Sequence, residues 1–389
     1  MSPKVKDILI LILINLGIAF LIWLPFYLKL PNLFGLNFSQ GMSAIFRNFD
    51  GMEYVIIAKS WYNPSIISGL PQDLPAEYFA AHFPGYSLLM MPLAPILGFL
   101  KSMILTSLLF TILSSIMFYL LVKDFKLSSS PLFLSIVFLI LPARWLIVHS
   151  IGSAETIFIF FTISALYFFM KFEEIKKYRF IILAGIFGMF AQLTRPPGIL
   201  LFLALIFYII WKIFKDNNQN IFKKMGHAIV NYLPLLLIPV ALLSVFYYYS
   251  IAYQDFWAYF HSGDNIHLGF PPFQVFNLNQ FWVGSIWLED IIYVLILGFL
   301  GGLLLFKQKL YPLAFFVLTY LGFSTLIAHR DISRYVLPIF PFVLIAFEKV
   351  LVSKEFKIVL AIVILAIYLY SQNFLIANTA PYPNPQLFN

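Results

Sequence analysis

Apolar stretches about as long as the hydrocarbon core of a bilayer is thick recur from one end of this chain to the other. A helix of about 20 apolar residues crosses roughly 30 Å of lipid, and only helices and closed barrels satisfy their backbone hydrogen bonds there. Hydrophobic residues make up 61% of the 389 positions, and charged residues 11%. The sequence therefore predicts an all-α, polytopic transmembrane helix bundle. About eleven spans are expected, at 8–28, 103–122, 131–148, 154–171, 180–194, 197–214, 229–252, 291–306, 310–328, 334–352 and 357–375.

We interpret residues 1–389 as a single membrane domain, because a helix bundle grows by adding spans rather than by enlarging one aqueous core. The formal net charge is +8. Lys and Arg nevertheless stand in short clusters between apolar runs, which is typical of topology signals, so no nucleic-acid partner is expected. The absence of cysteine from the sequence excludes disulfides, thiolate metal sites and a cysteine nucleophile.

The distribution of Lys and Arg predicts the orientation. With a cytoplasmic N-terminus and an odd number of spans, about 17 of these residues lie on the cytoplasmic side and about 8 on the exterior side. Ser87–Leu100 is apolar but short and contains two prolines, so we interpret it as an interfacial or re-entrant helix. The C-terminus is then exterior. The expected host is the plasma membrane, or the endoplasmic reticulum in a eukaryote.

Two long segments are expected on the exterior side, at 29–100 and 253–290. Five of the six histidines fall on the same side, so we expect the functional site there. The second segment contains a His-x-x-Asp-x-x-His pattern at His261, Asp264 and His267. Such a loop is more often a polar lid, and we assign it no metal.

The first exterior loop contains two carboxylates three residues apart, Asp50 and Glu53. If a helix begins at Asp50, both side chains project from one face at the membrane surface. Val55–Ala58 would then give this helix an apolar side to lie on the bilayer. Asp is also a favoured N-cap residue, so a purely structural role for Asp50 is an equal alternative. Further along, the Pro-Gly turn of His82–Tyr86 is expected to hold an imidazole against the entrance of the bundle.

These first-loop motifs, Phe49–Tyr54 followed by Ile57-Ala58 and then His82–Tyr86, resemble the first luminal loop of GT-C fold glycosyltransferases. The likeness is greatest to the GPI mannosyltransferase 2 (PIG-V) type. That family has Trp where this chain has Phe49, and Leu where it has Gly85. Three later motifs resemble the same enzymes in the same order: Ser153–Thr156, Thr194–Gly198 and His329–Pro338.

The resemblance implies a GT-C type glycosyltransferase that moves a hexose, mannose-like, from a polyprenyl-phosphate donor to an acceptor hydroxyl on a lipid, glycan or protein. It implies that Asp50 is the general base that deprotonates this hydroxyl. Arginines would stabilise the leaving phosphate, although an Arg at a helix end often snorkels or pairs with a neighbour such as Asp331. For Arg330 and Arg334 the functional role is favoured, whereas for Arg144 and Arg195 the two roles are about equal. The implied substrate-binding residues are Glu53, His82, Tyr86, Glu155, Arg195, Arg330, Arg334 and Tyr335.

A metal requirement stays open. Asp50, Glu53, Glu155 and His82 offer oxygen and nitrogen ligands for a divalent cation, but no fixed ligand spacing connects them.

Two other functions use similar lipid-linked substrates. A transporter or flippase predicts ionisable residues in mid-span and inverted repeats. Here mid-span charges are scarce and no repeat is apparent. A glycan ligase or polymerase usually carries its principal loop late in the chain, whereas this chain carries it early. Both alternatives are therefore less favoured than the glycosyltransferase.

Overall fold

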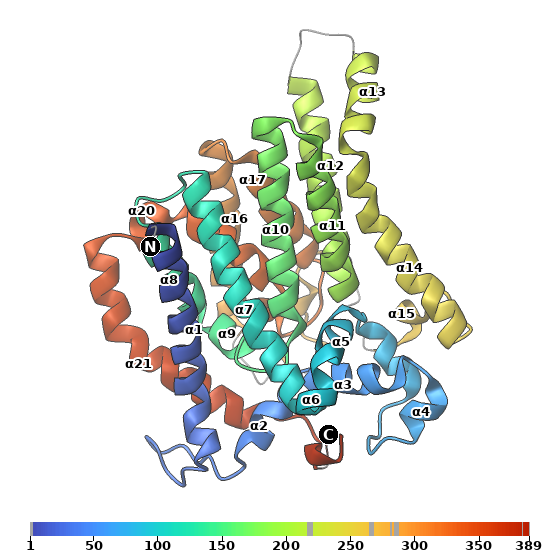
Figure 1. The fold of residues 1–389 in the computed structure, drawn as a ribbon, viewed down its shortest axis with the longest axis vertical. Helices are drawn as coiled ribbons and strands as arrows, with labels where there is room; N and C mark the ends of the chain where they lie inside the picture. Colours follow the sequence, from blue (N-terminus) through green and yellow to red (C-terminus); the bar gives the residue numbers. More distant parts are fainter. Residues whose placement is uncertain are drawn as a thin grey trace. The chain divides into compact units, whose positions relative to one another are not determined.

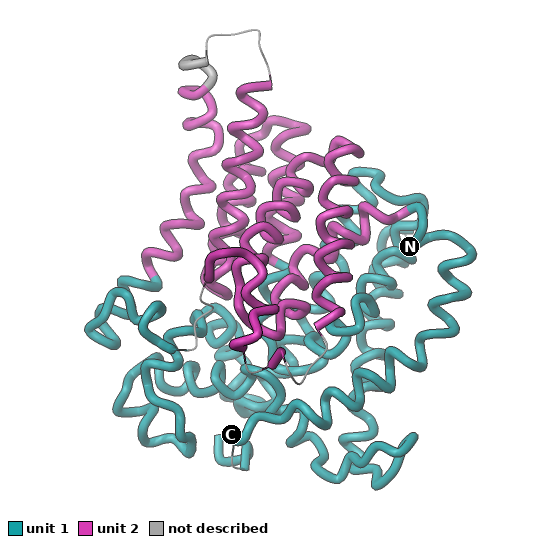
Figure 2. Tube along the Cα trace, turned by 180° about the vertical axis from the view of Figure 1, so that it is seen from behind, with its two compact units in different colours: residues 1–160, 245–265, 349–389 teal, residues 161–244, 266–348 magenta. Residues whose placement is uncertain are grey.

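The computed structural model describes residues 3–215, 221–263, 268–280, 282–283, 288–382 and 384–388. The chain divides into two compact units, which Figure 2 shows in different colours. Unit 1 comprises Met1–Phe160, Val245–Asn265 and Lys349–Asn389, and unit 2 comprises Phe161–Ser244 and Ile266–Glu348. Each unit is described by itself, and the single domain over residues 1–389 stays a prediction.

Unit 1 is built around long helices that pack through their apolar faces. In it α1 packs on α7 and α8, and α21 packs on α9 (Figure 1). The outer faces of α1 and α21 remain apolar, since Leu13 is 67% exposed and Ile362 is 72% exposed, which suits contact with lipid tails. The helices of unit 1 are α1 (Pro3–Tyr27), α2 (Met42–Phe46), α3 (Gly51–Ser60), α4 (Pro64–Ser68), η1 (Ala76–Ala81), α5 (Gly85–Met90), η2 (Met91–Leu93), α6 (Ala94–Leu97), α7 (Phe99–Asp124), α8 (Pro131–Ile140), α9 (Ala143–Val148), α15 (Ala258–His261), α21 (Lys354–Ala377) and η7 (Pro385–Phe388).

Unit 2 is a second helical bundle. In it α16 packs on α17 and α19, and α12 packs on α17. Glycines on α16 allow the close approach, because a Cβ built on Gly298 would lie 2.5 Å from Leu321 Cδ1. Its helices are α11 (Tyr178–Thr194), η3 (Pro196–Gly198), α12 (Ile199–Lys215), α13 (Ile221–Tyr232), η4 (Leu233–Leu236), η5 (Gln274–Phe276), α16 (Glu289–Lys307), α17 (Tyr311–Ser324), α18 (Ile332–Tyr335), η6 (Leu337–Ile339) and α19 (Phe340–Ala346). Three helices have residues in both units: α10 (Ala154–Ile175), α14 (Leu237–Ala252) and α20 (Glu348–Leu351).

The expected apolar spans coincide with helices. Among the described residues, seven helices are long and apolar enough to cross a membrane. The expected span 131–148 is divided into α8 and α9, because Pro142 cannot continue the helix that ends at Ile140. The expected span 334–352 is likewise divided, with Pro338 and Pro341 at the starts of new helices. The number of spans stays a prediction.

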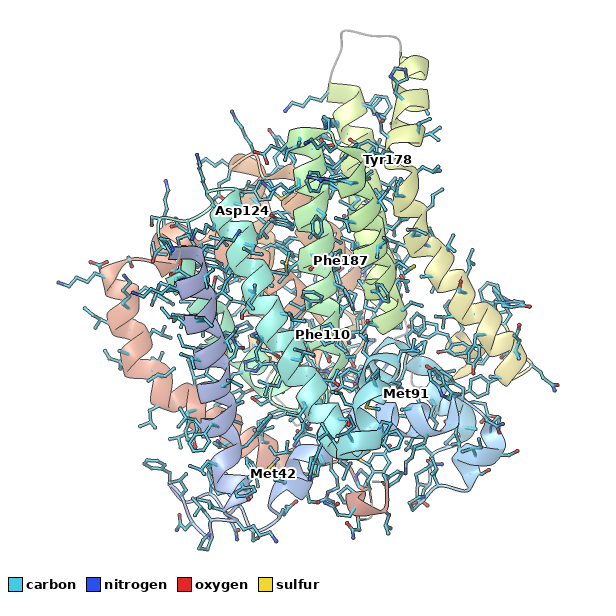
Figure 3. All side chains as sticks on the ribbon, in the orientation of Figure 1. Met42, Met91, Phe110, Asp124, Tyr178 and Phe187 are labelled. Atoms are coloured by element: carbon cyan, nitrogen blue, oxygen red, sulfur yellow. The ribbon has the colours of Figure 1, made fainter. Side chains whose placement is uncertain are left out.

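The first exterior loop folds into short helices, α2 to α6. Figure 3 labels Met91, on η2 within this loop, and Asp124, at the last residue of α7. Ser87–Leu100 is not one helix, since α5, η2 and α6 follow each other and Gly98, at φ +76°, separates α6 from α7. One interfacial or re-entrant helix was expected here. By contrast, α3 was expected to bury one side, and the structure buries every residue from Gly51 to Ala58.

The secondary structure of the described residues is helical. Three isolated β-bridges are present among them, and no β-strand. The predicted all-α membrane helix bundle is therefore confirmed, and this chain is an integral membrane protein.

Candidate functional site

Asp50 stands at the N-cap position of α3, and its side chain makes no capping hydrogen bond. The helix itself begins at Gly51, one residue after the start at Asp50 that the sequence analysis considered. The carboxylate therefore does not act as the cap of this helix, and the role of Asp50 stays a prediction. The side chain is half-buried, so part of it remains within reach of a ligand.

Glu53 lies one turn further along α3 and is buried, with 6% of its surface exposed. Its Oε1 accepts a hydrogen bond from Tyr382 Oη at 2.8 Å. Burial and then the neighbouring carboxylate raise the pKa of Tyr382, so its hydroxyl stays protonated and donates. Sequence analysis did not identify Tyr382, because no local motif marks it.

Glu155, on the first turn of α10, belongs to a buried hydrogen-bonded chain. Ser153 Oγ donates to Glu155 Oε2 at 2.5 Å, and the Ser153 amide donates to Ser107 Oγ at 3.1 Å. Ser107 Oγ lies 2.8 Å from Tyr86 Oη, which also donates to the Met103 carbonyl at 2.6 Å. Tyr86 thus connects to Glu155 through two serines.

The segments that carry Asp50 and Glu155 are in contact. A Cβ built on Gly51 would lie 3.1 Å from the carbonyl oxygen of Gly152. The first turn of α3 is therefore packed directly against the residues that lead into α10. Two of the predicted site residues are brought together in unit 1 by a contact that only small residues permit.

His82 is buried in unit 1 among aromatic rings. Its ring centroid lies 5.5 Å from that of Tyr54 and 5.8 Å from that of Tyr78. Tyr62 Oη donates to the carbonyl of His82 at 2.7 Å. The main chain at His82 is thus held by Tyr62, and its ring packs against Tyr54 of α3; the role expected of the Pro-Gly turn stays a prediction.

Arg195 belongs to unit 2 and is buried at the turn between α11 and α12. The turn is tight, because a Cβ on Gly198 would lie 2.5 Å from Cα of Gln192. The glycine of the Thr-Arg-x-x-Gly motif is therefore required by a close backbone approach.

Arg330, Arg334 and Tyr335 also belong to unit 2. Arg330 precedes α18, and Arg334 and Tyr335 lie in its last turn. Arg334 is buried, and its Nε lies 3.1 Å from Asp331 Oδ2. The Arg334 guanidinium also lies over the Tyr335 ring, 5.2 Å from its centroid. Arg330 is exposed. The pairing with Asp331 that the sequence left open is therefore present for Arg334.

The second exterior loop borders this segment within unit 2. The amides of Gly269 and Phe273 donate to the carbonyls of Leu326 and Thr325, both at 2.7 Å. Asp264 and His267 lie outside the described residues, and His261 pairs with Asp255 at 2.6 Å in unit 1.

In the part of the chain that the structure describes, no three His, Asp or Glu side chains form a group that could hold a metal ion. The carboxylates of Glu53 and Glu155 instead bond to hydroxyl groups. Unit 1 thus contains the half-buried carboxylate of Asp50 and the buried carboxylates of Glu53 and Glu155. A half-buried carboxylate is suited to taking a proton from a bound hydroxyl.

Comparison with known proteins gives two likenesses. A family model for dolichyl-phosphate-mannose-protein mannosyltransferase matches residues 100–260, a range that contains Glu155 and Arg195 and begins after the first exterior loop. Among solved structures, this chain is similar to the crystal structure of ArnT from Cupriavidus metallidurans bound to undecaprenyl phosphate. The two share 14% sequence identity at a TM-score of 0.56, over 96% of this chain and 67% of that chain. No curated protein matches the chain.

Proposed function

We propose that this chain, whose fold is of the ArnT-like GT-C type, is a membrane glycosyltransferase that moves a hexose from a polyprenyl-phosphate donor to an acceptor hydroxyl. Asp50 acts as the general base. The observation that carries this proposal is the difference among the three carboxylates of unit 1. Glu53 and Glu155 are buried, whereas Asp50, at the N-terminus of α3, is half-buried and so accessible to an acceptor.

The reaction is a displacement at the anomeric carbon of the donor sugar. Asp50 accepts the proton of the acceptor hydroxyl, and the acceptor oxygen forms a bond to the anomeric carbon. The bond from that carbon to the phosphate oxygen breaks, and its electron pair leaves with the polyprenyl phosphate. Negative charge grows on the phosphate during this step, so a cation beside it lowers the barrier.

Arginines are proposed as the cationic groups beside that phosphate. Arg guanidinium binds phosphate oxygens in a planar fork. We assign this role to Arg195, Arg330 and Arg334, with Tyr335 held under the Arg334 guanidinium. The undecaprenyl phosphate bound to ArnT and the dolichyl-phosphate-mannose of the matching family model both support a polyprenyl-phosphate donor. The family model and the first-loop resemblance favour mannose.

In unit 1, Glu53, His82, Glu155 and Tyr86 are assigned to the acceptor side. Tyr86 is fully buried, so we assign it to holding Ser107 and the Glu155 chain rather than to direct contact with sugar.

The proposal is tested by sugar transfer from radiolabelled polyprenyl-phosphate mannose or glucose to extracted acceptors, with the protein in liposomes. Asp50→Asn should keep the helical fold and lower the rate by about 10²- to 10⁴-fold, the usual loss for a general base. Asp73→Asn is the matched control, since Asp73 is an exposed carboxylate of the same loop, and it should transfer at the normal rate. Transfer by Asp50→Asn at the Asp73→Asn rate would remove Asp50 as the base. Movement of the intact donor across the liposome without transfer would favour a flippase.

A further inference from the structure

The residues after α21 return to the start of α3. Thr379 forms an isolated antiparallel bridge with Asn48, and the amide of Ala380 donates to the carbonyl of Arg47 at 2.7 Å. The side-chain amide of Asn48 donates to the carbonyl of Leu375 at 2.8 Å. The strip of chain just before Asp50 is therefore paired with the end of α21 and the residues that follow it.

Phe374, near the end of α21, supports the residue directly before Asp50. The rings of Phe49 and Phe374 are stacked, with centroids 5.5 Å apart and an angle of 25°. The Arg144 guanidinium lies over the Phe374 ring, 4.4 Å from its centroid. Phe49 has a φ of +45°, a left-handed conformation that costs free energy for a residue with a side chain. Stacking on Phe374 offsets this cost and sets the direction in which the chain enters Asp50.

The segment that follows α21 packs against α3 itself. The helix η7 contacts α3 and α7, and Tyr382 is buried with 6% of its surface exposed. Its hydroxyl donates to Glu53 at 2.8 Å. Glu53 is three residues after Asp50, so it lies on the same face of the first helical turn.

We propose that the C-terminal segment, Asn378–Tyr382 with η7, is a constituent of the catalytic centre, and that Tyr382 is a positioning residue that holds Glu53 and with it the first turn of α3. The inference rests on the proposed function. A buried carboxylate that loses one of its hydrogen-bond donors is disfavoured, and its side chain shifts. Loss of the Tyr382 hydroxyl should therefore displace the turn that carries Asp50.

Tyr382→Phe removes this hydroxyl alone. We expect kcat for sugar transfer to fall about tenfold, the usual effect of losing a hydrogen bond to a charged group, while the KM for the donor stays within about twofold. The matched control is Tyr293→Phe, because Tyr293 Oη also donates to a glutamate, Glu289, at 2.9 Å but is exposed on α16. This control should leave both constants unchanged.

A second comparison separates positioning from general loss of structure. In a Glu53→Gln background, Tyr382→Phe should lower kcat no further, because the hydroxyl acts through Glu53. Equal rates for Tyr382→Phe and Tyr293→Phe would overturn the role of Tyr382. A full additional tenfold loss in the Glu53→Gln background would overturn it as well.

The placement of the segment is tested without sugar transfer. Since the chain has no cysteine, Asn48→Cys with Thr379→Cys should give an intramolecular disulfide on oxidation with copper phenanthroline. Asp73→Cys with Thr379→Cys should give none. Absence of the first disulfide in folded, membrane-inserted protein would overturn the proposal. That result is distinguishable from a failure of the proposed function, which would appear as inactivity of the unmodified enzyme.

Discussion

Gly51 and Gly152 touch where α3 and α10 begin, so close that a Cβ on Gly51 would lie 3.1 Å from the Gly152 carbonyl oxygen. Met103 fills the space beside them. A Cβ on Gly152 would lie 2.4 Å from the Met103 sulfur. Two glycines and one thioether therefore determine how closely the Asp50 and Glu155 segments approach.

Gly152→Ala should destabilise the protein by about 1–3 kcal/mol, because an added methyl group in a filled interior forces Met103 to move. It should also slow sugar transfer, since α3 is pushed away from α10. Thermal unfolding and transfer rate measure the two effects, and Gly152→Ala with Met103→Ala should recover part of each. Gly17→Ala is the control, because a Cβ at Gly17 meets nothing within 4 Å. Equal behaviour of the two alanine variants would contradict the packing argument.

Arg330 and Arg334 should respond differently to replacement. Arg334 is buried and paired with Asp331, so Arg334→Gln should lower stability by about 3 kcal/mol in addition to weakening donor binding. Arg330 is exposed, so Arg330→Gln should weaken donor binding alone. The KM for the donor should rise about tenfold, and the melting temperature should stay unchanged. Lys349→Gln, which removes an exposed cation elsewhere, controls for net charge. An unchanged donor KM in Arg330→Gln would return that residue to a structural role.

The sequence predicted the helices well because each apolar stretch is a local signal that the membrane interprets in one way. A helix start near Asp50 could also be expected from capping preference, whereas Ser87–Leu100 was expected as one short helix and is divided into α5, η2 and α6. The burial of α3 on all its sides could not be predicted from its own residues. Whether a helix is covered on its second side depends on elements far away in the sequence.

Dependence on residues far away in the sequence also explains why Tyr382 and Phe374 were not identified as part of the candidate site. Tyr382 and Glu53 are 329 residues apart in the chain, and neither Tyr382 nor Phe374 stands in a motif. Phe49 replaces the Trp of the resembling family, and its stacking on Phe374 shows that the position still holds an aromatic ring against a partner. A pattern in one sequence reveals residue types suited to chemistry, but not the distant groups that orient them.

His149 should make stability depend on acid pH. Burial lowers the pKa of His149 to about 4, and its Nε2 lies 2.9 Å from the Leu139 carbonyl, to which the neutral ring donates. The unfolded chain has an ordinary histidine pKa of about 6.5, so it binds more protons than the folded chain between pH 6.5 and 4. Stability should therefore fall as pH drops through this window, by up to about 3 kcal/mol from this group.

His149→Gln tests this expectation, because the amide can still donate to Leu139 but does not titrate. Melting temperatures measured from pH 7 to pH 4 should fall less steeply in this variant than in the unmodified protein. His227→Gln, at an exposed position, should keep the original slope. Parallel slopes for all three proteins would show that His149 is not the group responsible.

The Asn48–Thr379 bridge also constrains the topology, since two residues that pair must lie on the same side of the membrane. The chain between them must then cross an even number of times. All expected spans except the first fall between these two residues, and their number is even. Counting Ser87–Leu100 as a further span would make the number odd. The bridge thus supports the same interpretation as the charge distribution.

Single cysteines in the cysteine-free chain test this with a membrane-impermeant maleimide. Asp73→Cys in the first exterior loop and Gln386→Cys in η7 should both react in intact cells, whereas Lys177→Cys should react only after permeabilisation; all three positions are exposed. Reaction of Asp73→Cys without Gln386→Cys would contradict the bridge. Protection of both Asp73→Cys and Gln386→Cys, with Lys177→Cys labelled, would agree with the bridge but reverse the predicted orientation. The pairing requires only that the two segments lie on the same side, and the positive charges alone predict which side that is.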